Sequence, residues 1–376
     1  MKPKEYPFYL KSTVVLFGLT LLSYALLNLK DILSPIAFSL IIAILLNPLV
    51  NRFQKKMPRA LAIAASMLIA LVIVSGVIYF LSSQIAHFSD AFPLLKAKFT
   101  TVLDDTRKLL QRDFGVSFEK QQQLISDAIN SGSAMVGHTL GSALGTLALV
   151  FLVPVYVFMF LLYKPLVLNF LYEVFADEHE KKVAEVLSQT KMAIQSYMVG
   201  LLLEALIVAV MNSAALLILG VEYAVLLGVI GALLNMLPYI GGLIAIALPV
   251  LMATVTKDGY STQLGVIGAY MLIQFIDNNI LVPRIVSSKV QINALISIIS
   301  VLLGGALWGI AGMFLTIPFV AILKIIFDRV DELKPWGKLL GDEIPTKRRN
   351  PFRRKAKKAP PEKAVSEKVV EKVAGK

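Results

Sequence analysis

The sequence contains no cysteine, and this absence excludes disulfide bonds, thiolate metal sites and a cysteine nucleophile. Charged residues are scarce as well: they make up 16% of the 376 residues, whereas a soluble domain carries about 25%. Hydrophobic residues reach 57%, and the mean hydropathy is +0.73. These values exclude an ordinary soluble enzyme, a disordered chain and a fibrous repeat, and they indicate a chain that lies mostly in a lipid bilayer.

Motifs for catalysis and for nucleotide binding are also missing. The three histidines, His87, His138 and His179, belong to no HExxH motif, and neither a Walker lysine loop nor a GxSxG sequence occurs. The sequence therefore predicts a protein that is not an enzyme and that uses no metal ion and no cofactor. If it transports, it is a channel, a facilitator or an ion-coupled carrier rather than an ATP-driven pump.

Apolar runs of membrane-spanning length follow one another along the chain. A spanning helix needs about 20 apolar residues, and six runs reach or approach that length. The pairs 223–255 and 292–327 are interrupted by Gly, Pro or polar residues, so each is either two short spanning helices or a hairpin that re-enters on one side. The runs lie at 14–29, 32–50, 60–81, 140–162, 197–219, 223–237, 240–255, 263–282, 292–303 and 306–327. We expect an all-α polytopic membrane protein with eight to ten transmembrane or re-entrant segments.

Basic residues gather at alternate ends of these runs. They occur in the amino terminus, in the loop 52–59, after the fourth run, after the eighth run and in the carboxyl-terminal tail. Because cytoplasmic loops are enriched in Lys and Arg, this alternation predicts that both termini are cytoplasmic. The segment 82–139 then lies on the opposite face.

The chain divides into five parts by composition. Residues 1–81 carry the first membrane helices, and 82–139 form an amphipathic helical insert, which acts as a cap or as a gate. Residues 140–327 form the transport core. They are followed by an interfacial segment, 328–346, and by a basic tail, 347–376, that we expect to be disordered.

The tail accounts for most of the formal net charge of +12, because residues 347–376 hold 12 Lys or Arg and 3 Asp or Glu, a net of +9. The basic composition therefore describes a tail and not a nucleic-acid-binding surface. The tail either binds anionic lipid or simply reinforces the orientation of the chain.

Few polar side chains interrupt the apolar runs, and ionisable groups at bilayer depth mark functional paths by default. Glu204 lies near the middle of its run, with Asn212 on the same face, and is either a proton or cation carrier or a structural carboxyl. Asn235 precedes a helix break. Offsets of three and four residues place Gln274, Asp277 and Asn278 on one helix face, although Asp277 could instead cap a helix near the interface.

Glycine and proline mark two helix breaks. The first is Pro238–Gly242, in which Pro238 removes a backbone donor and Gly241 and Gly242 allow non-helical angles. The second break lies in the pair of runs at 292–327, which contains Gly304, Gly309, Gly312 and Pro318. Interrupted membrane helices often form transporter binding sites, but glycines also serve close helix packing, and both interpretations stay open.

Three stretches carry a family resemblance: LLGVIGALLNMLPYIGGLIA, FIDNNILVPRIV and LLGGALWGIAGMFLTIPFVAILK, in this order. Over about residues 10–330 the chain resembles the autoinducer-2 exporter (AI-2E) family of permeases. It departs from the family pattern at Ser287–Ser288 and at Asn293–Leu295. The motif positions of the family fall on Pro238, Gly241, Gly242, Asp277, Asn278, Pro283, Gly304, Gly309, Gly312 and Pro318.

The resemblance implies an oligomeric, multi-pass protein of the bacterial inner membrane. Some family members are linked to export of autoinducer-2 and others to sodium/proton antiport. The first hypothesis is therefore an exporter of a small polar solute such as a quorum signal. The second is a sodium (or lithium)/proton antiporter that uses Glu204 or Asp277, and the third is a membrane scaffold. The expected partners are the lipid bilayer, further copies of the chain, and a small solute or monovalent cation, without nucleic acid.

The residues expected along the transport path are Glu204, Asn235, Pro238, Gly241, Gly242, Gln274, Asp277 and Asn278. Those expected to break or pack helices are Pro283, Gly304, Gly309, Gly312 and Pro318.

Overall fold

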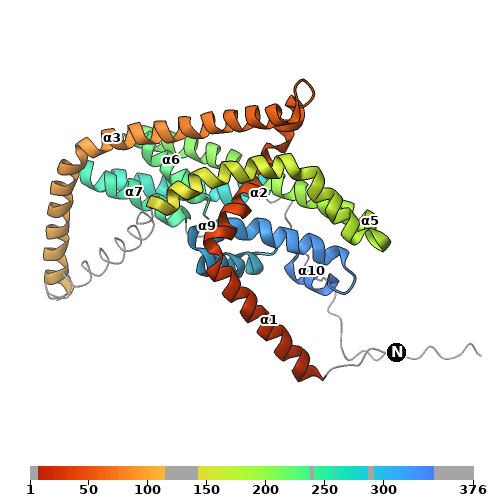
Figure 1. Ribbon diagram of the computed structural model, residues 1–376. Coiled ribbons are helices and arrows are strands. Elements are labelled where there is room, and N and C mark those ends of the chain that lie inside the picture. The colour runs from red at the N-terminus through yellow and green to blue at the C-terminus, as the bar shows by residue number, and fades with distance from the viewer. Residues whose placement is uncertain (1–6, 115–142, 238–240, 258, 287–291, 343–376) are drawn as a thin grey trace, which may run out of the picture. The chain divides into compact units, whose positions relative to one another are not determined.

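The computed structural model describes residues 7–114, 143–237, 241–257, 259–286 and 292–342. Within these ranges every regular element is helical, apart from one isolated bridge between Ile292 and Gly341. The predicted all-α class is thus confirmed. In chain order the helices are α1 (Phe8–Asn28), α2 (Lys30–Phe53), α3 (Arg59–Phe114), α5 (Ala143–Ile218), α6 (Ala224–Asn235), α7 (Gly241–Thr256), α8 (Ser261–Ile276), the π-helix η1 (Asp277–Val286), α9 (Ala294–Arg329) and α10 (Lys334–Leu340) (Figure 1).

Seven helical stretches in the described ranges are long and apolar enough to cross a membrane. Two shorter apolar helices, Ala224–Asn235 and Ile244–Thr256, add to them, in agreement with the expected eight to ten segments. The seven stretches are Phe8–Asn28, Lys30–Phe53, Arg59–Ala86, Phe151–Phe175, Lys181–Ile218, Ser261–Ile285 and Ala294–Arg329. Their large apolar side chains are widely exposed, as on α1, where Phe17 is 64% exposed. Such an apolar surface fits contact with lipid rather than with water.

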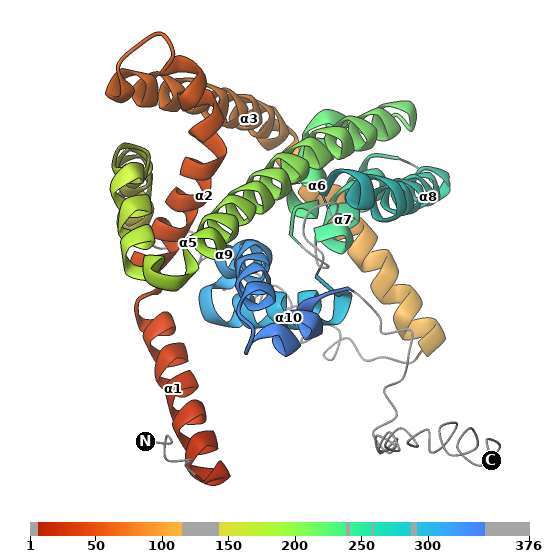
Figure 2. The ribbon, with the colours of Figure 1, turned by 90° about the vertical axis from the view of Figure 1, so that its right-hand side faces the viewer.

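Two of the helices run through boundaries that the sequence suggested. The first half of the predicted insert continues α3 without a break as far as Phe114, whereas the rest of the insert, 115–139, lies outside the described residues, as does the tail 347–376. The fourth and fifth apolar runs belong to a single helix of 76 residues, α5. This helix changes direction between its yellow-green and green parts (Figure 2). Pro154 and Pro165 lie inside the earlier stretch of α5, Phe151–Phe175.

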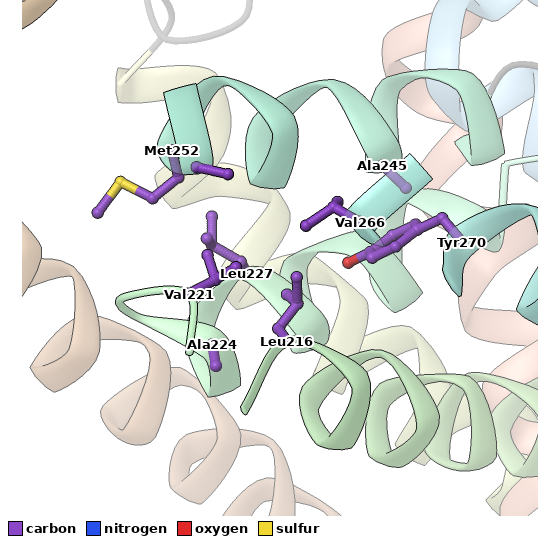
Figure 3. Close-up of a cluster of buried hydrophobic side chains, with 9 residues drawn as sticks. Leu216, Val221, Ala224, Leu227, Ala245, Met252, Val266 and Tyr270 are labelled. Carbon is purple, nitrogen blue, oxygen red and sulfur yellow. The ribbon is translucent and has the colours of Figure 1, made fainter. Parts of the chain in front are cut away.

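The end of α5 packs with α6, α7 and α8 around one apolar cluster (Figure 3). α5 contributes Leu216, α6 contributes Leu227, α7 contributes Ala245 and Met252, and α8 contributes Val266 and Tyr270. Burial of each large side chain of this kind stabilises the fold by about 1.5–3 kcal/mol. The cluster fixes the relative positions of the four helices that carry most of the polar residues singled out above.

The run 292–327 forms a sharp hairpin within α9. The backbone leaves helical geometry at Trp308 and Gly309, and Gly309 adopts φ 61° and ψ −141°, a region open almost only to glycine. The two halves of the hairpin then approach so closely at Gly304 and Gly312 that a Cβ atom at Gly304 would lie 2.7 Å from the carbonyl oxygen of Gly312. The indole Nε1 of Trp308 donates a hydrogen bond to the carbonyl of Leu26 in α1, at 2.9 Å.

Asn293 joins the start of α9 to the end of α10. Its side-chain oxygen accepts a hydrogen bond from the backbone N–H of Ile296 at 2.9 Å and so caps α9. Its amide donates to the carbonyls of Leu339 and Gly341 at 2.7 and 3.1 Å, and its backbone N–H donates to Leu340 at 3.0 Å.

Candidate functional site

Polar side chains from α5, α6, α8 and η1 meet beside the apolar cluster, in a region that we call the polar junction. It comprises Glu204, Asn212, Asn235, Tyr270, Gln274 and Asp277. Five of these residues, all except Glu204, line a small cavity of about 10 Å³, which is close to the smallest space that holds one water molecule. The cavity is also lined by Gly231 of α6 and Ala245 of α7, so the junction draws on every helix of this region.

Asp277 is the centre of the hydrogen bonds at the polar junction. Its Oδ2 accepts a hydrogen bond from Asn235 Nδ2 at 2.9 Å and another from Gln274 Nε2 at 3.3 Å. The same Gln274 nitrogen also lies 3.3 Å from Asn278 Oδ1. The side chain of Asp277 is only 2% exposed, so these donors replace water around a carboxyl that lies within an apolar span.

Glu204 brings a second carboxyl to the same place. It is buried on α5 at 6% exposure and lies near enough to Asp277 for the two carboxyls to interact electrostatically. Among the described residues no Lys or Arg forms an ion pair with either carboxyl. Two adjoining carboxyls that are shielded from water cannot both carry a negative charge unless a cation lies between them. The pair is therefore chemically able to take up and release a proton or a cation.

Three buried oxygen atoms at the polar junction have no hydrogen-bond partner among the described residues. They are Asn212 Oδ1, Tyr270 Oη and Asp277 Oδ1, and all three residues line the cavity. Leaving such atoms unpaired costs about 1–3 kcal/mol each, so a native site satisfies them with a ligand or with water. Oxygen atoms of this kind accept hydrogen bonds from hydroxyl groups and coordinate hard cations.

The break between α6 and α7 sets the width of the junction. A Cβ atom at Gly241 would lie 2.8 Å from the Cα of Asn235, and one at Gly242 would lie 2.5 Å from Gln274 Oε1. Only glycine permits this approach, which holds α7 against the amides of Asn235 and Gln274. The intervening Pro238 lies outside the described residues.

The segment that begins at Asp277 is a π-helix and not the α-helix that the sequence suggested. Segments with i→i+5 bonding are rare and are frequently found at functional sites. Asn278 and Pro283 are both exposed on η1, and Asn279 donates to the carbonyl of Phe275 on a different side. The predicted grouping of Gln274, Asp277 and Asn278 is confirmed by the hydrogen bonds among them.

The other expected positions lie elsewhere. Gly304, Gly309, Gly312 and Pro318 belong to the α9 hairpin, and none of them lines the cavity at the polar junction. Tyr270 was missed by the sequence analysis, although it precedes Gln274 by four residues and so lies on the same face of α8.

Comparison with known proteins places the chain in a family. Residues 12–332 match the family described as "AI-2E family transporter". The chain is 26% identical to the "AI-2 transport protein TqsA" of Escherichia coli, over 89% of this chain and 96% of that protein. It is 27% identical to a "Putative transport protein" of Haemophilus influenzae, over 83% of this chain and 90% of that protein.

These relatives are bacterial, and the match agrees with the apolar helices in describing a multi-pass transporter of the inner membrane. The chain belongs to the AI-2E family of transporters.

Proposed function

We propose that the chain carries a small polar solute across the inner membrane and that the polar junction binds this solute. The observation that carries the proposal is the set of three unpartnered oxygen atoms around Asp277, which line a cavity between helices of membrane-spanning character. A solute that donates hydrogen bonds from hydroxyl groups would satisfy them. Autoinducer-2 is the first candidate, because a relative that aligns over most of the chain is named for its transport.

The size of the cavity indicates whether the described site is open or closed to a solute. A cavity of about 10 Å³ holds one water molecule but no metabolite, so the described arrangement is a closed one. Entry of a solute requires α7 to separate from α6 and α8 at the Gly241–Gly242 approach. Transport then consists of opening this approach on one side of the membrane and closing it again.

Flux in proteoliposomes tests the proposal. Vesicles that contain the purified chain are loaded with autoinducer-2, and its efflux is compared for wild type, Asp277→Asn and Glu222→Gln. Glu222 is an exposed carboxyl beyond the end of α5 and serves as the matched control. Efflux that is lost only in Asp277→Asn supports the proposal. Efflux from wild-type vesicles no faster than from empty vesicles, across a panel of polar metabolites, would overturn it.

A second candidate function is exchange of sodium or lithium for protons. It is favoured by the contact between Glu204 and Asp277, because exchange needs a carboxyl group that cycles between a proton and a cation. Asn212 Oδ1 and Tyr270 Oη would complete the oxygen ligands of a dehydrated cation.

A pH-sensitive dye inside the same vesicles distinguishes the two functions. Addition of sodium or lithium outside should change the internal pH if exchange takes place, and Glu204→Gln and Asp277→Asn should each abolish the change. An unaltered response in both variants would contradict a role for the carboxyl pair. A wild type without any cation response would leave solute export as the function of the site.

We further propose that both termini face the cytoplasm, that residues 82–139 lie on the other side, and that the chain forms homo-oligomers. The alternation of basic residues supports the orientation, and the family resemblance supports the oligomer. Because the chain has no cysteine, a single cysteine introduced at Ser366 reports the side of the tail. In inside-out vesicles it should react with a membrane-impermeant maleimide, whereas in right-side-out cells it should not.

A further inference from the structure

A second cavity lies away from the polar junction, where the end of α2 and the start of α3 meet the first arm of α5, its stretch Phe151–Phe175. It measures about 330 Å³, within the range of about 300–1,000 Å³ that is typical of small-ligand sites. Its polar lining is made of Arg59, Lys164, Tyr172 and the amides of Asn47, Asn51, Gln54 and Asn169. Among the described residues, this lining contains two cations and no Asp or Glu.

The donors in this cavity exceed the acceptors. Arg59 donates from one terminal nitrogen to the carbonyl of Leu161 at 2.6 Å, and Lys164 Nζ donates to Asn47 Oδ1 at 3.0 Å. However, Asn47 Nδ2 and Arg59 Nε are buried and have no hydrogen-bond partner in the part of the chain that the structure describes. Asn47 is itself only 5% exposed, so an unpaired donor is held in place at the wall of the cavity.

Among the described residues, no ion pair joins Arg59, Lys164 or Lys191 to a carboxylate. Lys191 and Arg59 both lie near enough to Lys164 to repel it. Arg59 is the first residue of α3, so the positive end of that helix adds to the local potential. Two lining cations with Lys191 nearby, two unpaired donors and a described lining without acids together make a site that is complementary to an anion.

The apolar side chains around the cavity favour an anion that is part of a lipid. Val50 and Leu161 line it and belong to a buried cluster with Ala62, Ile63 and Val157. Leu166 and Phe170, in the same arm of α5, are exposed within a stretch of membrane-spanning character. A phospholipid with its phosphate in the cavity would therefore have its acyl chains beside an apolar helix surface.

We propose that this cavity binds a phosphate group, with the headgroup of an anionic phospholipid as its occupant. Arg59, Lys164 and Asn47 hold the phosphate oxygens. Arg59 and Lys164 thus form part of a defined site, in addition to biasing the orientation of the chain. This proposal does not depend on the solute that the polar junction carries.

Thermal unfolding in nanodiscs tests the proposal with the full-length chain. Discs of phosphatidylcholine alone are compared with discs that also contain phosphatidylglycerol, and a ligand bound only to the folded chain raises the unfolding midpoint. Native mass spectrometry counts the phosphatidylglycerol that stays bound. The double variant Arg59→Gln/Lys164→Gln should lose both the rise in midpoint and at least about tenfold in retained lipid, as expected when two charge-assisted contacts are removed.

Lys55→Gln/Lys56→Gln is the matched control, because it removes the same charge from exposed residues of the loop between α2 and α3 that do not line the cavity. It should keep the response of the wild type. An equal loss in both double variants would show only general surface attraction and would overturn the proposal.

Asn47→Asp provides a test that does not remove a cation. It replaces the unpaired donor with a carboxylate that faces Lys164, and this internal anion should exclude the external one while the fold is retained. A response to phosphatidylglycerol that persists in this variant contradicts the proposal.

Glycerol 1-phosphate and inorganic phosphate, added to discs of phosphatidylcholine alone, distinguish the sources of the anion. Stabilisation by phosphatidylglycerol only identifies a lipid site, and stabilisation by the soluble phosphates as well identifies a site for free phosphate esters. Stabilisation of the wild type by none of them overturns the proposal.

Discussion

Closure of the α9 hairpin depends on the absence of a side chain at Gly312. This residue is buried, and a Cβ atom there would overlap the carbonyl oxygen of Gly304 and lie 3.0 Å from the Cβ of Trp308. The obstacle is backbone on one side, so no rotamer change removes it. The substitution Gly312→Ala therefore forces the two halves of α9 apart.

The size of the effect follows from two opposed terms. Overpacking of a closed contact costs about 1–3 kcal/mol, and alanine in a helix interior gains up to about 1 kcal/mol over glycine. We expect a net loss of about 1–2 kcal/mol in the free energy of unfolding, since the overlap with backbone puts the first term near its upper end. Gly268→Ala is the matched control, because nothing lies within 4 Å of its Cβ position, and it should be neutral or stabilising.

Two further glycines of the hairpin extend this comparison. A Cβ atom at Gly305 would lie 2.7 Å from the end of the flexible Met313 side chain, which can move, so Gly305→Ala should cost less than Gly312→Ala. At Gly309 there is open space, but the positive φ of 61° strains any other residue, at a cost of about 1–2 kcal/mol.

Equilibrium unfolding in mixed micelles measures these differences. Tryptophan fluorescence is a suitable signal because the chain has only two tryptophans and one of them, Trp308, lies at the hairpin. If Gly312→Ala proves as stable as Gly268→Ala, the two halves of α9 do not pack as described and the argument fails.

Three other predictions concern contacts outside the two cavities. Trp308→Phe removes the hydrogen bond to a backbone carbonyl of α1 and should lower stability by about 0.5–1.5 kcal/mol; no change in a chemical unfolding curve would contradict it. Arg329 and Glu185 form an ion pair at 2.8 Å between α9 and α5, and a double-mutant cycle with alanine should give a coupling of about 0.2–1 kcal/mol that decreases in high salt. A coupling insensitive to salt would exclude an exposed ion pair. A hydrogen bond from Lys334 lowers the pKa of Asp331. A lowered pKa stabilises the fold fully above the unfolded value of about 3.9, and this stability is lost as the pH falls through the lowered pKa of the folded state. Asp331→Asn should therefore melt at a lower temperature than wild type at pH 7 and converge with it in acid. A difference that persists in acid would refute this.

The membrane character of the chain and its polar side chains could be predicted from the sequence because they depend on local pattern. Offsets of three and four residues correctly placed Gln274, Asp277 and Asn278 in contact. The glycines of the second break correctly marked a turn, which the structure places at Gly309. The role of these residues in transport stays a prediction.

Contacts between distant segments could not be predicted in the same way. Periodicity shows which face of a helix is polar, but not which faces meet, so the approach of Glu204 to Asp277 came only from the structure. Arg59 and Lys164 illustrate a different difficulty. Basic residues at the end of a membrane run set orientation whether or not they also line a cavity, so their sequence gives no sign of the second role.

The three hydrogen bonds that Asn293 donates have a practical consequence for truncation. They all end at or before Gly341, and the compact unit of the chain ends at Asp342. A stop codon after Asp342 thus leaves every acceptor for Asn293 in place, and a purification tag fused there replaces the tail without cost to α9. A stop codon before Leu339 removes all the α10 carbonyls that Asn293 contacts and should release the start of α9, far from the cut in sequence.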